Sequence, residues 1–168
     1  MEIQSYIDAL SGVLGQEVKT NEHGLHAFIL DNIPVMLHFR PVDSSCLLHM
    51  EIGYPTGFGG RILSRLLGAN FLLSETHGAA ISLDERTGLA FLEYTFSLAT
   101  LDGPGFVAQV EGFVALADVW TKRLQEWNRE IESDVDARLG TLFQELERGD
   151  EATDSKQGES FPNTMLRV

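Results

Sequence analysis

Cysteines, basic residues and long apolar runs are scarce in this sequence. Cys46 is the only cysteine among 168 residues, which excludes an intramolecular disulfide and favours a reducing compartment. Lys and Arg number 12 against 25 Asp and Glu, and the formal charge of -13 disfavours binding to nucleic acid or to an anionic membrane. No apolar run approaches the ~20 residues that a membrane-spanning helix needs. Residues 1–4 are neither basic nor followed by such a run, so we expect no secretory signal and a cytoplasmic location.

Motifs for nucleotide binding and catalysis are also lacking. The glycine-rich stretch 54–60 has neither a Gly-Lys-Ser/Thr ending nor a GxGxxG pattern, which disfavours a phosphate-binding loop. Glu75, His77, Asp84 and Glu85 are acid–base candidates by residue type, but they lie in or beside predicted turns, where charged side chains normally face water. No nucleophile stands beside a base in the pattern. We expect a protein that is not an enzyme and that needs no cofactor.

Apolar residues recur with the periods of both helices and strands. Steps of three and four residues indicate helices, and alternation indicates strands. Short polar links join the strands, as in consecutive hairpins. The expected elements, in chain order, are a helix over 3–14, strands over 24–30, 33–40 and 45–54, a helix over 61–69, strands over 79–83 and 88–98, a turn over 102–105, and a long helix from 106. The predicted fold is α+β, with an antiparallel sheet built from a three-stranded meander plus a hairpin, three helices, and the order α-βββ-α-ββ-α.

Strand alternation also predicts a register for the sheet. We place Ala27 opposite Leu37, Leu37 opposite Met50 and, in the later hairpin, Ile81 opposite Leu92. One face of the meander then becomes wholly apolar, as a buried side requires. The other face is mixed, and its apolar members are Phe28, Leu30, Met36 and Leu47. Either these side chains form a surface for a partner, or another segment of the chain covers them.

Three histidines share the mixed face in this register. His26, His38 and His49 fall side by side on adjacent strands, an arrangement that could hold zinc. No carboxylate or cysteine is clearly placed to orient them. Solvated histidines are the default expectation, and we predict no metal site.

The long helix carries an apolar stripe. Its apolar residues recur at alternating four- and three-residue steps from Phe106 to Ile131. The bulky aromatic members suit packing across a sheet better than a two-chain coiled coil. Residues 126–151 hold nine acidic and three basic residues, so this stretch is either a solvated helical face or a docking site for a basic partner.

These patterns predict a single domain with a polar tail. We expect a domain over residues 1–148, with a core over 1–131 and an acidic helical extension over 132–148. Residues 149–168 are polar and poor in core residues, so we expect them to be mostly disordered.

A resemblance to a known family emerges from the order of these elements. The residues that carry it are Leu66-Leu67-Gly68-Ala69-Asn70, Ala80-Ile81-Ser82-Leu83-Asp84, Gly88-Leu89-Ala90-Phe91-Leu92, Leu101-Asp102 and the helix over 113–124 with Trp120. Together they resemble the class I type III secretion chaperone family, also called the Tir chaperone or CesT family. The resemblance covers roughly residues 1–130, and the stretch after Ile131 is longer than the family pattern.

The resemblance implies a homodimeric chaperone without nucleotide hydrolysis. Such a chaperone binds the N-terminal region of a secreted effector in extended form and keeps it soluble and secretion-competent. The resemblance implies that the helix over 61–69 lies at the dimer interface, so the candidates there are Ile62, Leu63, Leu66 and Leu67. An extended effector would pair along a strand edge and place apolar side chains near Phe28, Leu30, Met36 and Leu47. The alternative is an adaptor or regulatory protein of similar fold that binds a folded partner, such as a regulator or the secretion ATPase.

Overall fold

The computed structural model describes residues 3–22, 24–56 and 60–154, with side chains up to residue 145. The elements are α1 (Ile3–Leu14), β1 (Lys19–Thr20), β2 (His26–Leu30), β3 (Ile33–Arg40), β4 (Ser45–Gly53), α2 (Arg61–Ala69), the short 3₁₀ turn η1 (Phe71–Leu73), β5 (Ala80–Leu83), β6 (Ala90–Ser97) and α3 (Gly103–Asp154). The chain divides into two compact units, residues 1–129 and 130–168. No helix in the described ranges combines the length and apolarity that crossing a membrane requires.

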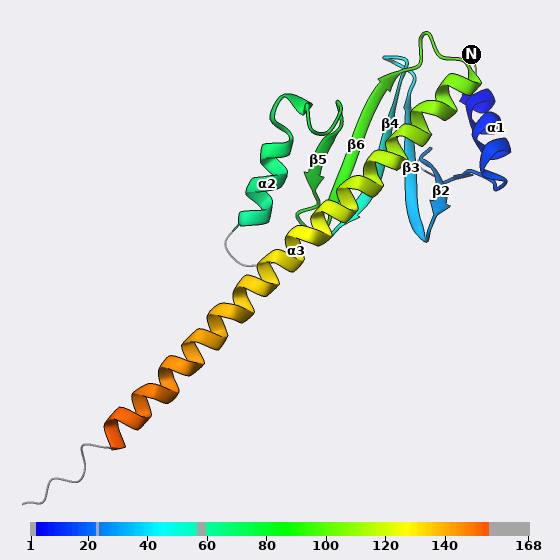
Figure 1. Ribbon diagram of the computed structural model, residues 1–168. Coiled ribbons are helices and arrows are strands. Elements are labelled where there is room, and N and C mark those ends of the chain that lie inside the picture. Colours follow the sequence, from blue (N-terminus) through cyan, green and yellow to red (C-terminus); the bar gives the residue numbers. More distant parts are fainter. Residues whose placement is uncertain (1–2, 23, 57–59, 155–168) are drawn as a thin grey trace, which may run out of the picture. The chain divides into compact units, whose positions relative to one another are not determined.

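All strands join one antiparallel sheet in the order β1-β2-β3-β4-β6-β5 (Figure 1). The predicted fold class and element order are confirmed. The meander and the later hairpin meet where β4 pairs with β6, and Ile81 lies opposite Leu92 as predicted. Strand β1 escaped prediction because it has only two residues. It pairs with the first half of β2 alone.

Two helices of the first unit cover one face of the sheet (Figure 1). Aromatic rings join the layers, because Tyr6 of α1 lies 4.9 Å from Phe106 of α3 and Phe106 lies 5.8 Å from Phe39 of β3, between ring centroids. The predicted stripe of α3 packs across the sheet, and its buried members up to residue 129 are Phe106, Val107, Val110, Phe113, Ala117, Trp120 and Leu124. Removing one such ring costs about 3–5 kcal/mol of stability, so this layer forms the core. The opposite side of the sheet is the outer face.

The predicted register gives the right faces for β3 and β4 and the wrong faces for β2. Leu37 pairs with Leu48 and not with Met50 as predicted, a difference of two residues that leaves the faces of β3 and β4 unchanged. Val35, Leu37 and Phe39 are buried, as predicted. Leu37, however, pairs with His26 and not with Ala27, so the predicted pairing of β2 differs from the observed one by one residue. A slip of one residue turns every side chain of a strand to the opposite face.

The turn between β2 and β3 determines the observed pairing and explains the one-residue difference from the prediction. Asp31 and Asn32 both have left-handed backbones, with φ of 49° and 67°. Two consecutive residues of this kind form a two-residue hairpin turn of the I′ type. The turn therefore pairs Leu30 directly with Ile33, and every other pair of β2 and β3 follows.

Helix α3 is longer than predicted at both ends, and it begins at Gly103, within the predicted turn. It continues to Asp154, so residues 149–154 are helical and their assignment to a disordered tail is wrong. A single glycine costs a helix only about 1 kcal/mol, and Gly149 is followed by the good helix formers Glu151 and Ala152. The rest of the predicted tail, 155–168, lies outside the described residues.

Candidate functional site

The structure separates the four side chains predicted for effector binding. Phe28 is only 3% exposed, and its pairing with Val35 places it on the core face. Leu30 is half-buried on that same face. The assignment of both residues to the outer face is therefore wrong, because it depended on the slipped register. Met36 and Leu47 do lie on the outer face, half-buried, and their role in binding stays a prediction.

Ile29 takes the place predicted for Phe28. Its side chain is 51% exposed on the outer face, next to Pro34 on β3. The signal that could have found it is the Asp31-Asn32 pair, since a two-residue turn determines which β2 residues face outward. Ile29 is thus an exposed, β-branched residue on a strand near the edge of the sheet.

The edge of β2 is open beside Ile29. Strand β1 pairs only with Ala27 and His26, and no described strand lies beside residues 28–30. The Ile29 carbonyl accepts a hydrogen bond of 2.8 Å from the side-chain amide of Gln16. Both backbone groups of a strand residue point to the same side, so the N–H of Ile29 also faces this edge. Among the residues that the structure describes, the exposed side chain of Gln16 is the group bonded to this edge at Ile29, and an extended chain could displace it.

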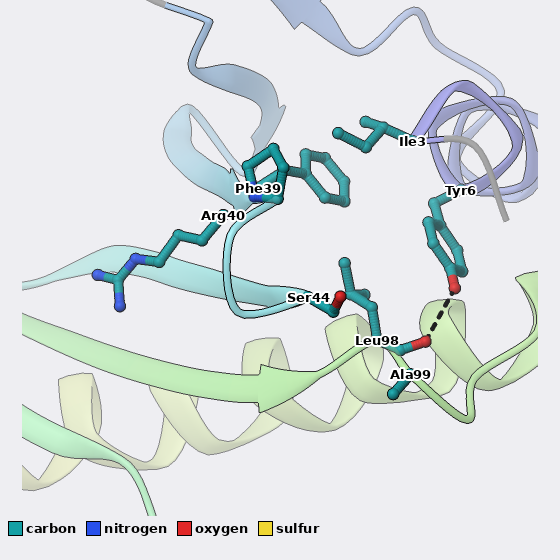
Figure 2. Close-up of a pocket in the computed structure, with 8 residues that line it drawn as sticks. Ile3, Tyr6, Phe39, Arg40, Ser44, Leu98 and Ala99 are labelled. Carbon is teal, nitrogen blue, oxygen red and sulfur yellow. Dashed lines mark hydrogen bonds between the residues drawn. The ribbon is translucent and has the colours of Figure 1, made fainter.

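A cavity of about 570 Å³ opens at the other end of β3. Figure 2 shows Ile3 and Tyr6 of α1, Phe39 of β3 and Leu98 after β6 turned toward this cavity, whereas the guanidinium of Arg40 points away from it. The Tyr6 hydroxyl donates to the carbonyl oxygens of Leu98 at 3.2 Å and Leu101 at 2.9 Å. These bonds satisfy the phenol and leave its ring as an apolar wall. The cavity can accept an apolar side chain of a partner.

A polar network occupies the middle of the outer face. His49 Nδ1 lies 3.2 Å from Glu93 Oε1, and the Ser82 hydroxyl donates to the same oxygen at 2.9 Å. The His49 ring stacks on Phe91 at 4.4 Å between centroids. The carboxylate thus stands between serine and histidine, and the histidine does not reach the hydroxyl as a catalytic base would. The network fixes side chains on this face of the sheet.

The predicted histidine row does not form. His26 lies on the core side, where its ring meets Phe39 edge-on at 5.2 Å and burial lowers its pKa. His38 and His49 remain on the outer face. Within the described ranges, no group of three or more His, Cys, Asp or Glu side chains converges to hold a metal ion.

The acid–base candidates and the thiol have structural surroundings. Asp84 organises its turn, because hydrogen bonds from the Arg86 N–H and the Thr87 hydroxyl hold its carboxylate and lower its pKa. Glu75 pairs with Arg123 at 3.2 Å. Burial raises the pKa of the Cys46 thiol to about 12, so it stays protonated and is a poor nucleophile at neutral pH.

Helix α2 has one buried and one exposed apolar side. Ile62 and Leu66 are buried within the protomer, so their assignment to a dimer interface is wrong. Leu63 and Leu67 are exposed, at 40% and 70%. The helix needed one apolar side for its own core, and the four-residue pattern did not separate the two sides. The exposed side continues into η1, and we call its members the α2 surface: Leu63, Leu67, Phe71 and Leu72.

Comparison with protein families gives a clear result. The sequence model of the Tir chaperone protein (CesT) family matches residues 5–121. The chain belongs to the Tir chaperone family. This confirms the resemblance to class I type III secretion chaperones that residues 66–124 carry. A comparison with curated proteins finds no match to the sequence.

Several solved structures share the fold of this chain. The ExsC–ExsE complex matches with a TM-score of 0.63 and 21% identity, over 74% of this chain and 97% of the other. The HopA1–SchA chaperone–effector complex matches with a TM-score of 0.56 and 22% identity, over 75% of this chain and 92% of the other. The Yersinia pestis type III secretion chaperone SycH, in complex with a fragment of YscM2, matches with a TM-score of 0.52 and 22% identity, over 68% of this chain and 98% of the other. At these identities the likeness establishes the fold.

Proposed function

We propose that this Tir chaperone family member is a homodimer that holds the N-terminal segment of a secreted effector in extended form, and so keeps the effector soluble and competent for secretion. The observation that carries the proposal is the open edge of β2 at Ile29. An extended segment that adds there gains main-chain hydrogen bonds without demanding a particular sequence. The chaperone–effector complex among the structural relatives supports this kind of partner.

Two apolar features would select the effector. The exposed Ile29 side chain, with Met36 nearby on β3, offers contacts to alternate side chains of the added strand. The cavity between Tyr6, Phe39 and Leu98 offers a site for a further apolar side chain. Backbone pairing would supply affinity, and these contacts would supply selection among effectors. The proposed binding needs no cofactor and no catalytic step.

The α2 surface is the proposed contact between subunits. Leu63, Leu67 and Phe71 follow one another at four-residue steps, and each is exposed. Leu72, the next residue, is 80% exposed. Its φ of 56° lies in the left-handed region, a conformation that costs a non-glycine residue about 1–2 kcal/mol. Exposed apolar side chains on a strained segment are typical of an interaction surface. A second copy would cover them.

The test is co-expression of the full chain with the product of the neighbouring reading frame as candidate effector. We expect a copurifying complex in which protease cuts the effector but spares one N-terminal segment, and in which amide exchange at Ile29 slows. Ile29→Lys should abolish capture. Val42→Lys, at an equally apolar and fully exposed turn position, should not.

The adaptor alternative makes the opposite prediction. The chain is an adaptor if the captured protein stays folded and protease spares no N-terminal segment of it. In that case the captured protein should bind through residues 126–151 and dissociate at high salt. Absence of any protected effector segment, with Ile29→Lys behaving as the wild type, would also refute the chaperone proposal.

A further inference from the structure

The chain covers the edge of β2 with a segment of its own, residues 16–21. Strand residues that face one edge alternate, so Leu25 and Ala27 point their backbone groups to the same side as Ile29. The Asn21 N–H donates to the Leu25 carbonyl at 2.9 Å, and the Asn21 side-chain oxygen accepts from the Leu25 N–H at 3.0 Å. Next along the edge, β1 pairs with Ala27. The covering segment therefore runs antiparallel to β2, in the place that a strand of a partner would take.

The cover weakens toward Ile29. In the register of β1 the backbone of Glu17 would come opposite Ile29, but β1 begins only at Lys19. The exposed Gln16 side chain takes the place of that backbone, with its one bond to the Ile29 carbonyl. A partner strand therefore meets least resistance at Ile29, and the next edge residue it reaches is Ala27.

Few contacts hold β1 on this edge. Lys19 and Thr20 are both exposed, and the Thr20 hydroxyl lies 2.8 Å from His26 Nδ1. Hydrogen bonds at exposed positions add little stability, because water competes for the same groups. Val18 is the buried side chain of the covering segment, and in the register of β1 it comes opposite the buried Phe28. The cover can leave at low cost if a partner supplies another apolar side chain at that position.

A partner strand that pairs with Ile29 alone would gain little. One edge residue offers two backbone hydrogen bonds, whereas strands in sheets usually extend over about five residues. Displacing β1 frees the groups of Ala27 as well and so doubles the ladder. Each bond that β1 loses is replaced by an equal bond to the partner, so the exchange itself costs little.

We propose that an effector strand enters at Ile29 and displaces residues 16–20 from the edge of β2. This inference rests on the proposed function and adds a competitor within the chaperone itself. The vacated position of Val18 fits an apolar side chain, so the effector strand should carry one between the residues that pair with Ile29 and Ala27. Because the cover must leave first, it lowers the apparent affinity for every effector and rejects segments that lack this side chain.

A disulfide tests whether β1 has to leave. Directly paired residues of antiparallel strands have Cα atoms about 4.5–5.5 Å apart, which a disulfide can span, so Thr20→Cys/His26→Cys joins β1 to β2. The probe is a fluorescent synthetic peptide of the N-terminal segment encoded by the neighbouring reading frame. Fluorescence anisotropy should give a Kd about tenfold or more higher for the oxidised full-length variant than for the same variant reduced. The wild type should bind equally in both buffers, because Cys46 is buried.

Weakening the cover should have the opposite effect. Lys19→Pro removes the backbone N–H that pairing with Ala27 needs, so the Kd of the peptide should fall about two- to tenfold. Lys19→Ala removes the same charge but keeps the N–H, and it should bind the peptide within about twofold of the wild type.

Alkylation reports the displacement directly. Val18→Cys places a thiol at a position that is 5% exposed in the free protein, so it should react slowly with a maleimide. With the peptide bound, the reaction should accelerate about tenfold or more, because the segment has left the edge. Val13→Cys, at a position of α1 that is 61% exposed, is the control and should react at the same rate with and without the peptide.

Three results would each overturn the displacement while the wild type binds the peptide. These are an equal Kd for the oxidised and the reduced disulfide variant, a Kd for Lys19→Pro that is no lower than for Lys19→Ala, and labelling of Val18→Cys that the peptide does not accelerate. Each would show that the effector binds with β1 in place, and the chaperone proposal would stand. A peptide that the wild type does not bind counts against the proposed function itself, and the displacement falls with it.

Discussion

Asn70 pairs with Ile81 as a neighbouring strand would. Its side-chain amide donates to the Ile81 carbonyl at 2.9 Å, and the Ile81 N–H donates to the Asn70 side-chain oxygen at 2.8 Å. Asn70 ends α2, and Ile81 lies in the middle of the edge strand β5. One side chain thus ties α2 to the sheet and occupies both outward-facing groups of this edge residue. The two ends of the sheet differ, because two side-chain bonds close β5 at Ile81 while one from Gln16 occupies β2 at Ile29.

Asn70→Ala should destabilise the first unit by about 1–3 kcal/mol, because both Ile81 groups lose partly buried hydrogen bonds. Urea denaturation measures this loss, and amide exchange at Ile81 should accelerate. The freed edge should also favour association of chains, visible as added mass in light scattering. Gln125→Ala, which truncates an exposed amide on α3, is the control and should leave all three readouts unchanged. An Asn70→Ala protein with wild-type stability would show that the Asn70 amide is dispensable.

The one-residue error in the predicted register of β2 shows where sequence reasoning succeeds and where it fails. The end of α1 was predictable because local chemistry determines it: Gly15, with its left-handed φ of 64°, follows the last helical residue. Apolar alternation was enough for β3 and β4, since each buries one side. In β2 both faces carry apolar residues, so alternation was ambiguous. The Asp31-Asn32 turn decided the register, and a length rule for two-residue hairpins would have identified Ile29 as the exposed residue.

The cavity could not be predicted by local rules. Its walls come from α1, from the end of β3 and from the segment after β6, so Tyr6 and Leu98 meet only after the sheet has formed. Sequence patterns report which side chains share one element. They do not report which elements leave space between them. The same limit explains α2, where spacing identified four apolar residues but packing decided which two are buried.

Filling the cavity should block an effector side chain from entering. Ala99 lies in the cavity wall and is exposed, so Ala99→Trp places a large ring there at little cost to the core. If the proposed function holds, capture of the effector should fall about tenfold or more, because an apolar side chain loses its site. Thr100→Trp adds the same ring at the next, exposed position and should capture effector normally. Pull-down with equal protein concentrations compares them, and equal capture by both variants would remove the cavity from the binding site.

The buried thiol should make stability fall at alkaline pH. The pKa of Cys46 rises from 9.0 to about 12 in the folded protein, because burial penalises the thiolate. Below pH 9 the thiol is neutral in both the folded and the unfolded chain, so protonation of Cys46 lowers the stability of neither state relative to the other there. Above pH 9 the unfolded chain ionises first, and stability declines up to about pH 12. Thermal denaturation from pH 8 to 10.5 should show a steeper decline for the wild type than for Cys46→Ala, and the thiol of the native protein should resist alkylation at pH 8. Rapid alkylation without unfolding would contradict this.

Adjacent leucines of α2 should respond to a charge in opposite ways. Leu66 is 5% exposed, so Leu66→Glu buries an unpaired carboxylate and should unfold the first unit, with loss of the cooperative thermal transition. Leu67 is 70% exposed, so Leu67→Glu should change the free energy of unfolding by less than about 1 kcal/mol. If the α2 surface joins two subunits, Leu67→Glu should nevertheless convert the dimer to a folded monomer in light scattering. A Leu67→Glu protein that stays dimeric at micromolar concentration would place the subunit contact elsewhere, because a carboxylate in an apolar interface costs several kcal/mol.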